Sequence, residues 1–209
     1  TDCYPRQELD KTVTLRTLPN AMLCNPRNGY QNYNVAVNRS AKRPIGHRPS
    51  NVLFDAQDYP DDAWQCIIDL NVTSTLLPTQ YAVKAMIQGG RGGKVLNLSS
   101  VRGMLGINAG YSAYVAAKGA INSLTRQWAT EWAKYGINVN AIAPGYMATR
   151  NTKPIQDDPV RNEQIMARIP AGRWGQPEDL QGAAVFLASA ASDYLHGYTI
   201  AVDGGWLAR

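Results

Sequence analysis

A serine, a tyrosine and a lysine in the middle of the chain have the types and spacing of a proton-transfer site. Tyr114 and Lys118 are four residues apart, so both side chains project from one face if the segment is helical. An ammonium beside a phenol favours the phenolate and lowers the phenol pKa from about 10. Such a phenol can exchange a proton with a carbonyl or alcohol oxygen, and the Ser100 hydroxyl could hold that oxygen. For the pair alone, the alternative is a surface helix with its tyrosine ring on the core and its lysine in solvent.

The elements around these residues would bring them to one edge of a sheet. The apolar segment 94–99 follows a glycine-rich turn and predicts a buried strand that ends at Ser99 and Ser100. A helix is then expected from about Ser112 to Tyr135, with Gly136 ending it in the left-handed conformation. Residues 137–142 predict the next strand.

Helical and polar segments flank this central region. Apolar residues recur at helical spacing from Asp61 to about Gln88, which predicts one long helix that bends near Pro78 or starts again there. The segment 148–175 is polar and interrupted by prolines, with helical character over 159–168. A long connection of this kind is typical of a substrate lid.

The remaining patterns complete an α/β domain. A helix is expected over 177–188, and strands are expected over 12–15, 34–37 and 198–202. Strands that alternate with helices predict a doubly wound, mostly parallel sheet. We interpret residues 1–209 as a single domain whose first 50 residues are atypical, because prolines interrupt them and no periodicity is clear.

Composition narrows the functional classes. The chain has 209 residues, no apolar run of membrane-spanning length and no charged-then-apolar opening, so we expect a cytoplasmic protein without a membrane partner. Three widely spaced cysteines and two distant histidines indicate neither a disulfide framework nor a metal site. The net charge of +5 arises within residues 1–50, which we interpret as a solvated loop rather than a nucleic-acid surface. Attraction of an anion, such as a cofactor phosphate, is a further option.

Four motifs, in this order, resemble the short-chain dehydrogenase/reductase family. They are Asn97-Leu98-Ser99-Ser100, Tyr114-Val115-Ala116-Ala117-Lys118, Asn138-Val139-Asn140-Ala141-Ile142-Ala143-Pro144-Gly145 and Val202-Asp203-Gly204-Gly205. The resemblance covers about residues 58–209. It implies a Rossmann-like fold, NAD or NADP as cofactor, a small-molecule substrate and a homotetramer.

The resemblance also implies catalytic roles for matching residues. Tyr114 would be the general acid/base, Lys118 would lower its pKa and bind the nicotinamide ribose, and Ser100 would polarise the substrate oxygen. Ser99 remains an alternative, because Ser100 precedes Tyr114 by fourteen positions, one more than the commonest spacing in the family. Asn71 would hold a water in a proton relay with the lysine. On the residues alone it could also be a polar residue on an exposed helix face.

The family pattern further implies cofactor contacts at the end of the strand over 137–142. Pro144, Gly145 and Thr149 match the positions that contact the nicotinamide end of the cofactor. Without the other motifs, the same residues would describe an ordinary turn after a strand. Gly145 would allow a close approach of backbone to the nicotinamide.

The first 50 residues depart from the family. The family begins with a glycine-rich turn whose backbone amides hold the cofactor diphosphate at a helix N-terminus, and no such turn occurs here. The residue that selects NAD over NADP therefore has no assignment. Either the cofactor half has been lost, leaving a non-catalytic homologue, or the sequence is incorrect over residues 1–50. We favour the second explanation, because a Ser/Tyr/Lys set without a hydride carrier would have no task.

Several segments indicate the class of substrate. Residues 143–149, 168–175 and 203–209 resemble the 2-deoxy-D-gluconate 3-dehydrogenase (2-dehydro-3-deoxy-D-gluconate 5-dehydrogenase) branch of the family, whereas Ser100 to Lys118 is more similar to broader polyol and carbonyl reductases. The resemblance implies interconversion of a secondary alcohol and a ketone on a small sugar-acid-like or polyol-like molecule. Arg102 or Arg150 could bind a substrate carboxylate with two hydrogen bonds, or could equally be a structural ion-pair partner.

Overall fold

Four strands form one sheet in the computed structural model, which describes residues 21–24, 53–107 and 110–209. They are β1 (Ala21–Cys24), β2 (Gly93–Leu98), β3 (Ile137–Pro144) and β4 (Thr199–Val202), paired in that order. β2, β3 and β4 are parallel, whereas β1 runs antiparallel to β2. The predicted α/β class with a mostly parallel sheet is confirmed. The sequence does not predict β1, and the strands expected over 12–15 and 34–37 lie outside the described residues.

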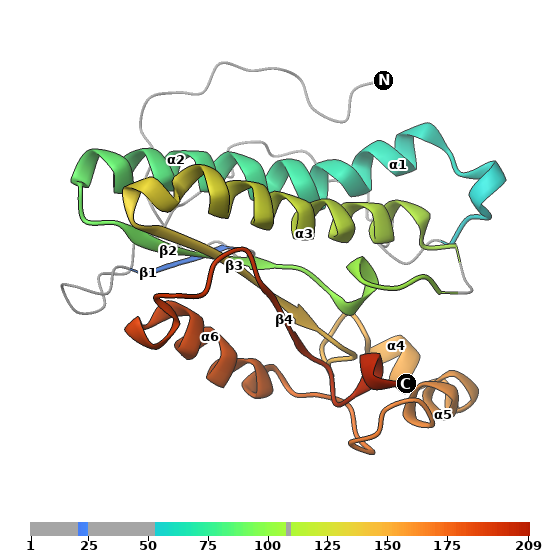
Figure 1. Ribbon diagram of the computed structural model, residues 1–209. Helices are drawn as coiled ribbons and strands as arrows, with labels where there is room; N and C mark the ends of the chain where they lie inside the picture. The colour runs from blue at the N-terminus through green and yellow to red at the C-terminus, as the bar shows by residue number, and fades with distance from the viewer. Residues whose placement is uncertain (1–20, 25–52, 108–109) are drawn as a thin grey trace.

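Helices cover both faces of this sheet (Figure 1). α2 (Ser74–Gly89) and α3 (Ser112–Trp132) lie on one face, and α6 (Gln181–Ala188) lies on the other. The expected helix that ends at Gly136 is confirmed, because α3 continues into a 3-10 turn and Gly136 has a φ of 68°.

Alternation along the strands explains why the sheet is covered on both sides. Val95 on β2 and Val139 on β3 pack with Trp128 of α3 in one buried cluster. Leu96 and Ile142, one and three residues further along the same strands, point to the opposite face and pack against α6. Since both faces of β2 and β3 are apolar, only a doubly wound arrangement removes both from water.

The irregularity expected near Pro78 lies about one turn earlier. α1 (Asp61–Ile68) joins α2 through a π-helical turn at Asp69–Thr73, and Pro78 is buried within α2. Hydroxyl groups stabilise this wide turn: Thr75 Oγ1 donates to the Asn71 carbonyl at 2.8 Å, and Ser74 Oγ donates to the Leu70 carbonyl at 2.5 Å. Carbonyls displaced from regular helix pairing are thereby satisfied upstream of the proline.

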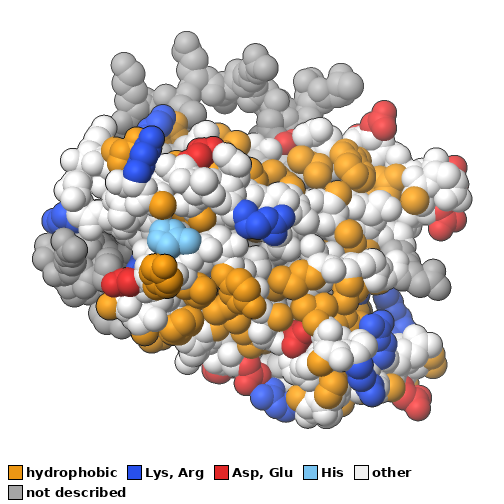
Figure 2. Space-filling view, viewed as in Figure 1, with side chains coloured by type: hydrophobic (Ala, Val, Ile, Leu, Met, Phe, Trp, Pro, Cys, Tyr) orange, Lys and Arg blue, Asp and Glu red, His pale blue; other side chains and the backbone are white. Residues whose placement is uncertain are grey.

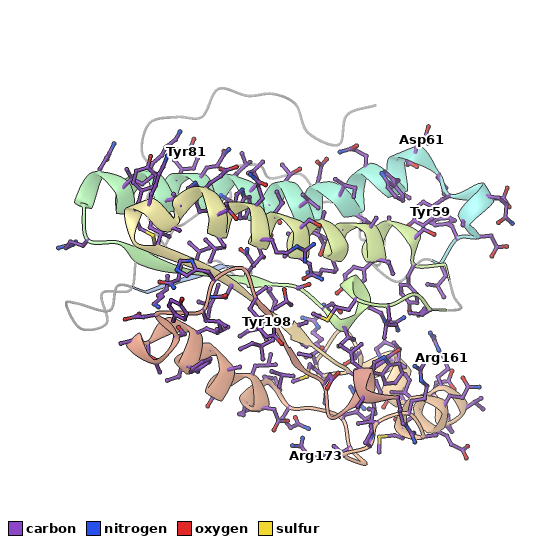
Figure 3. The ribbon with its side chains drawn as sticks, in the orientation of Figure 1. Tyr59, Asp61, Tyr81, Arg161, Arg173 and Tyr198 are labelled. Carbon is purple, nitrogen blue, oxygen red and sulfur yellow. The ribbon has the colours of Figure 1, made fainter. Side chains whose placement is uncertain are left out.

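The segment 148–175 leaves the end of β3 and returns to it. It carries α4 (Lys153–Gln156) and α5 (Pro159–Met166), which confirms the helical character expected over 159–168. Met147 forms an isolated parallel bridge with Gly175, and the Gly175 amide donates to the Tyr146 carbonyl at 2.9 Å. Arg173 and Asp179 form an ion pair with N–O distances of 2.7 and 2.9 Å beside this bridge. Arg161 on α5 and Arg173 both lie toward the outer side of the molecule (Figure 3).

The described residues contain neither a membrane-spanning helix nor a cluster of metal-ligating side chains. No helix among residues 53–107 and 110–209 is long and apolar enough to cross a membrane. In the same part of the chain, no group of histidine, cysteine, aspartate or glutamate side chains has the arrangement of a metal site.

Candidate active site

The two serines at the end of β2 point to different partners. Ser99 Oγ is buried and donates to Asn122 Oδ1 on α3 at 2.6 Å. Ser100 Oγ instead accepts the Arg102 amide at 3.2 Å and hydrogen-bonds the Tyr114 phenol. Successive residues of an extended segment project to opposite sides, so only one of the two can face the tyrosine. The structure therefore favours Ser100 over Ser99 as the residue of the predicted site.

α3 brings Tyr114 and Lys118 to the same place, as their spacing predicts. Lys118 is buried, and its Nζ lies 5.6 Å from the centre of the Tyr114 ring. The ammonium donates to the Leu98 carbonyl at the end of β2 at 3.0 Å. Ser100, Tyr114 and Lys118 thus converge at the carboxyl end of β2. This is the edge at which doubly wound sheets bind ligands.

The electrostatics of the pair differ from the expectation. Burial raises the pKa of the Tyr114 phenol above its usual value, and the hydrogen bond with Ser100 and the positive charge of Arg102 reduce that rise. Burial also lowers the pKa of Lys118 to about 8. Desolvation dominates both groups here, and the cation that acts on the phenol is Arg102; a lowering of the Tyr114 pKa by Lys118 stays a prediction.

Asn71 lies inside the π-helical turn between α1 and α2. Its side-chain amide is half-buried and donates to the Ile67 carbonyl at 3.0 Å. Turns of this kind are frequent at functional sites. The structure binds this amide to its own helix, and a proton-relay role for Asn71 stays a prediction.

The predicted cofactor residues follow β3. The Gly145 amide donates to the Val202 carbonyl of β4 at 3.0 Å. A Cβ at Gly145 would lie 2.6 Å from the Asp203 Cα, so close backbone packing requires this glycine in addition to any ligand. Thr149 is exposed at the start of an open groove. The groove is lined by Ala148, Thr149, Arg150, Lys153, Pro154, Gln156 and Asp157.

An aromatic cluster beside Ser100 was not predicted. The Tyr146 ring lies 4.7 Å from the Trp206 ring and 5.4 Å from the Trp174 ring, measured between centroids. Arg102 also reaches Tyr146, because its guanidinium donates to the Tyr146 hydroxyl. These residues are far apart in the sequence, so no local pattern predicts that they meet. The sequence indicates only that Arg102 lies near the site, because it follows Ser100 by two positions.

Comparison with known proteins places this arrangement in a family. A sequence model described as Enoyl-(Acyl carrier protein) reductase matches residues 43–207, which is most of the chain. The chain belongs to the short-chain dehydrogenase/reductase family. A second model, described as Homocysteine biosynthesis enzyme, sulfur-incorporation, matches residues 1–54. That stretch includes the region in which the glycine-rich turn of the dehydrogenase family is missing.

Similar members of the short-chain dehydrogenase/reductase family include bacterial sugar-acid enzymes. A 2-dehydro-3-deoxy-D-gluconate 5-dehydrogenase from Bacillus subtilis (strain 168) is 52% identical over 185 residues, covering 83% of this chain and 71% of that protein. The protein of the same name from Dickeya dadantii (strain 3937) is 52% identical over 157 residues, covering 74% of this chain and 61% of that protein.

Solved structures of the family share the fold. A gluconate 5-dehydrogenase from Burkholderia cenocepacia, in complex with NADP and tartrate, is 36% identical and has a TM-score of 0.71. The match covers 77% of this chain and 64% of that one. The chain therefore spans about 61% of the Dickeya protein and 64% of the Burkholderia protein.

Proposed function

We propose that this protein is an NAD(P)-dependent oxidoreductase that interconverts a secondary alcohol and a ketone on a small sugar-acid-like or polyol-like substrate. The observation that carries the proposal is the convergence of Ser100, Tyr114 and Lys118 at the carboxyl end of β2. The activities in the names of the Bacillus and Dickeya relatives support the same reaction class.

In the proposed mechanism, the side chains handle the proton. During reduction the Tyr114 hydroxyl gives its proton to the ketone oxygen, and during oxidation the phenolate takes the proton of the alcohol. The Ser100 hydroxyl donates to the same oxygen and stabilises the charge that develops on it. The nicotinamide, when bound, supplies or accepts the hydride.

The residues near β3 fit the nicotinamide half of such a cofactor. The Lys118 ammonium has three donors, of which the bond to Leu98 uses one, so it could also bind a ribose hydroxyl. Pro144, Gly145 and Thr149 would border the nicotinamide, and the groove at Thr149 carries hydroxyl and cationic side chains together with Asp157, which pairs with Lys153. Among the described residues, no helix begins at a glycine-rich turn that could hold the diphosphate. The NADP in the Burkholderia structure supports a nicotinamide cofactor, NAD or NADP.

Initial rates at 340 nm test the proposal. We expect the chain to reduce NADP or NAD in the presence of 2-dehydro-3-deoxy-D-gluconate, and Tyr114→Phe to lose about 100- to 10,000-fold in rate. Tyr135→Phe is the matched control, because Tyr135 is exposed at the other end of α3 and should keep wild-type activity. Wild-type activity in Tyr114→Phe would refute the assignment. A folded chain without cofactor binding or turnover would support a non-catalytic homologue instead.

We also propose that the protein is a homotetramer. Large apolar side chains are exposed on α6 and beside β4, including Val185, Phe186 and Tyr198, with exposures of 58%, 40% and 57%. Figure 2 shows hydrophobic side chains gathered over this part of the surface, and Figure 3 labels Tyr198 there. Exposed apolar patches of this kind mark interaction sites. Light scattering should give a tetramer for the wild type and a smaller species for Phe186→Glu.

The segment 148–175 is proposed as a lid over the site, within a single domain whose residues 1–50 remain atypical. The pairing of Met147 with Gly175 supports this role, because both ends of the segment are held at one point near the site. Tryptic cleavage after Arg150, which is exposed and followed by Asn151, should slow when NADPH and substrate are present. An unchanged cleavage rate would contradict the lid.

A further inference from the structure

Arg102 is a buried cation two residues after the proposed catalytic serine. Its exposed fraction is 9%, and its backbone amide donates to Ser100 Oγ. The side chain lies between two aromatic rings, with Cζ 5.0 Å from the centre of Tyr111 and 5.3 Å from the centre of Tyr146. Arg102 is thus held rigidly beside the residues that would carry the reaction.

The guanidinium is incompletely satisfied. One terminal nitrogen donates to the Tyr146 hydroxyl, whereas Nη1 is buried and has no hydrogen-bond partner within the described part of the chain. No carboxylate among the described residues forms an ion pair with Arg102. Arginine cannot lose its charge in a protein, so burying it without an anion is costly. The two aromatic contacts offset only part of that cost.

The charge of Arg102 also acts on the Tyr114 phenol, the proposed acid/base. Its positive charge lowers the pKa values of both Tyr114 and Tyr146, against the rise caused by burial. Tyr146 follows Gly145 directly, so the contact with the Tyr146 hydroxyl holds the guanidinium near the end of β3.

We propose that Arg102 is the specificity-determining residue that binds the carboxylate of the substrate through its unpaired Nη1 donor. The inference rests on the proposed function and narrows its substrate class to hydroxy acids and keto acids. A carboxylate would receive a charge-assisted hydrogen bond and would neutralise the buried guanidinium. Planar donors make arginine better suited than lysine to hold a carboxylate in a fixed orientation.

D-gluconate and D-sorbitol provide a matched pair of ligands, because they differ by a carboxylate in place of a hydroxymethyl group. Binding is followed by tryptophan fluorescence, since Trp174 and Trp206 lie beside Tyr146. Turnover with NADP is measured for the same two molecules. The variants are Arg102→Met and Arg102→Lys, with circular dichroism as a check of folding. Arg126→Met is the control, because Arg126 is exposed on α3 about 18 Å along the helix from Tyr114.

We expect the wild type and Arg126→Met to prefer gluconate. Arg102→Met should weaken gluconate binding by about 10- to 150-fold, the effect of losing a charge-assisted hydrogen bond, and should leave sorbitol binding within about threefold. In turnover, the loss should fall on KM more than on kcat, because the carboxylate does not react. Arg102→Lys should recover only part of the preference, and it decides the matter if Arg102→Met does not fold.

Three results would overturn the inference. They are a wild type without preference for gluconate, an unchanged preference in a folded Arg102 variant, and an equal loss for both ligands, which indicates a purely structural arginine. Failure of the proposed function gives a different result. In that case neither the wild type nor any variant turns over gluconate or sorbitol, while the Arg102-dependent preference for gluconate in binding persists.

Discussion

Replacing Ser99 and Ser100 by alanine, one at a time, should separate a structural hydroxyl from a reacting one. Ser99 Oγ donates to Asn122 Oδ1 at 2.6 Å, and the remaining partner of that oxygen is Thr199 Oγ1 at 3.3 Å. Removing the Ser99 hydroxyl leaves a buried acceptor poorly satisfied, which costs about 1–3 kcal/mol of unfolding free energy. For a chain of this size, that corresponds to a fall in Tm of roughly 2–12 °C. Turnover should change little.

Ser100→Ala should differ mainly in turnover. Its hydroxyl accepts the Arg102 amide at 3.2 Å and hydrogen-bonds the Tyr114 phenol, so the stability loss should be about 1–2 kcal/mol. Loss of a donor to the substrate oxygen should lower kcat by about 100- to 1,000-fold.

The two variants are compared by initial rates at 340 nm and by thermal unfolding followed by circular dichroism. The reasoning is refuted if Ser99→Ala loses as much activity as Ser100→Ala while it keeps its Tm. A Ser99→Ala variant that is inactive because it has unfolded would not refute the reasoning, so rates are measured well below the Tm of that variant.

Three further predictions concern Lys118, Gly145 and the first residues. Lys118 has its pKa lowered to about 8 by burial, so the unfolded chain binds more protons than the native chain between that pH and the ordinary lysine pKa. Unfolding free energy should rise by up to about 3 kcal/mol from pH 8 to pH 10.5, and Lys118→Met should lack this rise in denaturant titrations. Gly145→Ala should cost about 1–3 kcal/mol, because its Cβ would meet Asp203, whereas Gly106→Ala, which meets no atom within 4 Å, should be neutral. We expect the purified protein to differ from the sequence over residues 1–50 and to carry a glycine-rich turn there. An intact mass of 22.9 kDa, with peptides that match residues 1–50 of the sequence, would contradict this.

Local patterns predicted the central elements well. α3 and β3 follow from strong periodicity and from Gly136, which ends the helical segment. The bend expected near Pro78 lies instead in the π-helical turn before α2, because a proline can be recognised in a sequence and a π-helical turn cannot. That turn depends on hydroxyl–carbonyl bonds such as Thr75 to Asn71, which form only once the helix is built.

The sequence alone determined which residues could react. Tyr114 and Lys118 share a helix face because of their spacing, and Ser100 follows a strand, so the chemistry of the site is readable before any fold is known. Tertiary structure decided how these groups behave. It directed Ser99 to Asn122 and Ser100 to Tyr114, and it buried beside them a guanidinium whose Nη1 has no hydrogen-bond partner among the described residues. It also reversed the expected shift in the Tyr114 pKa. Desolvation and charge depend on which segments pack around a group, and no spacing along one chain segment contains that information.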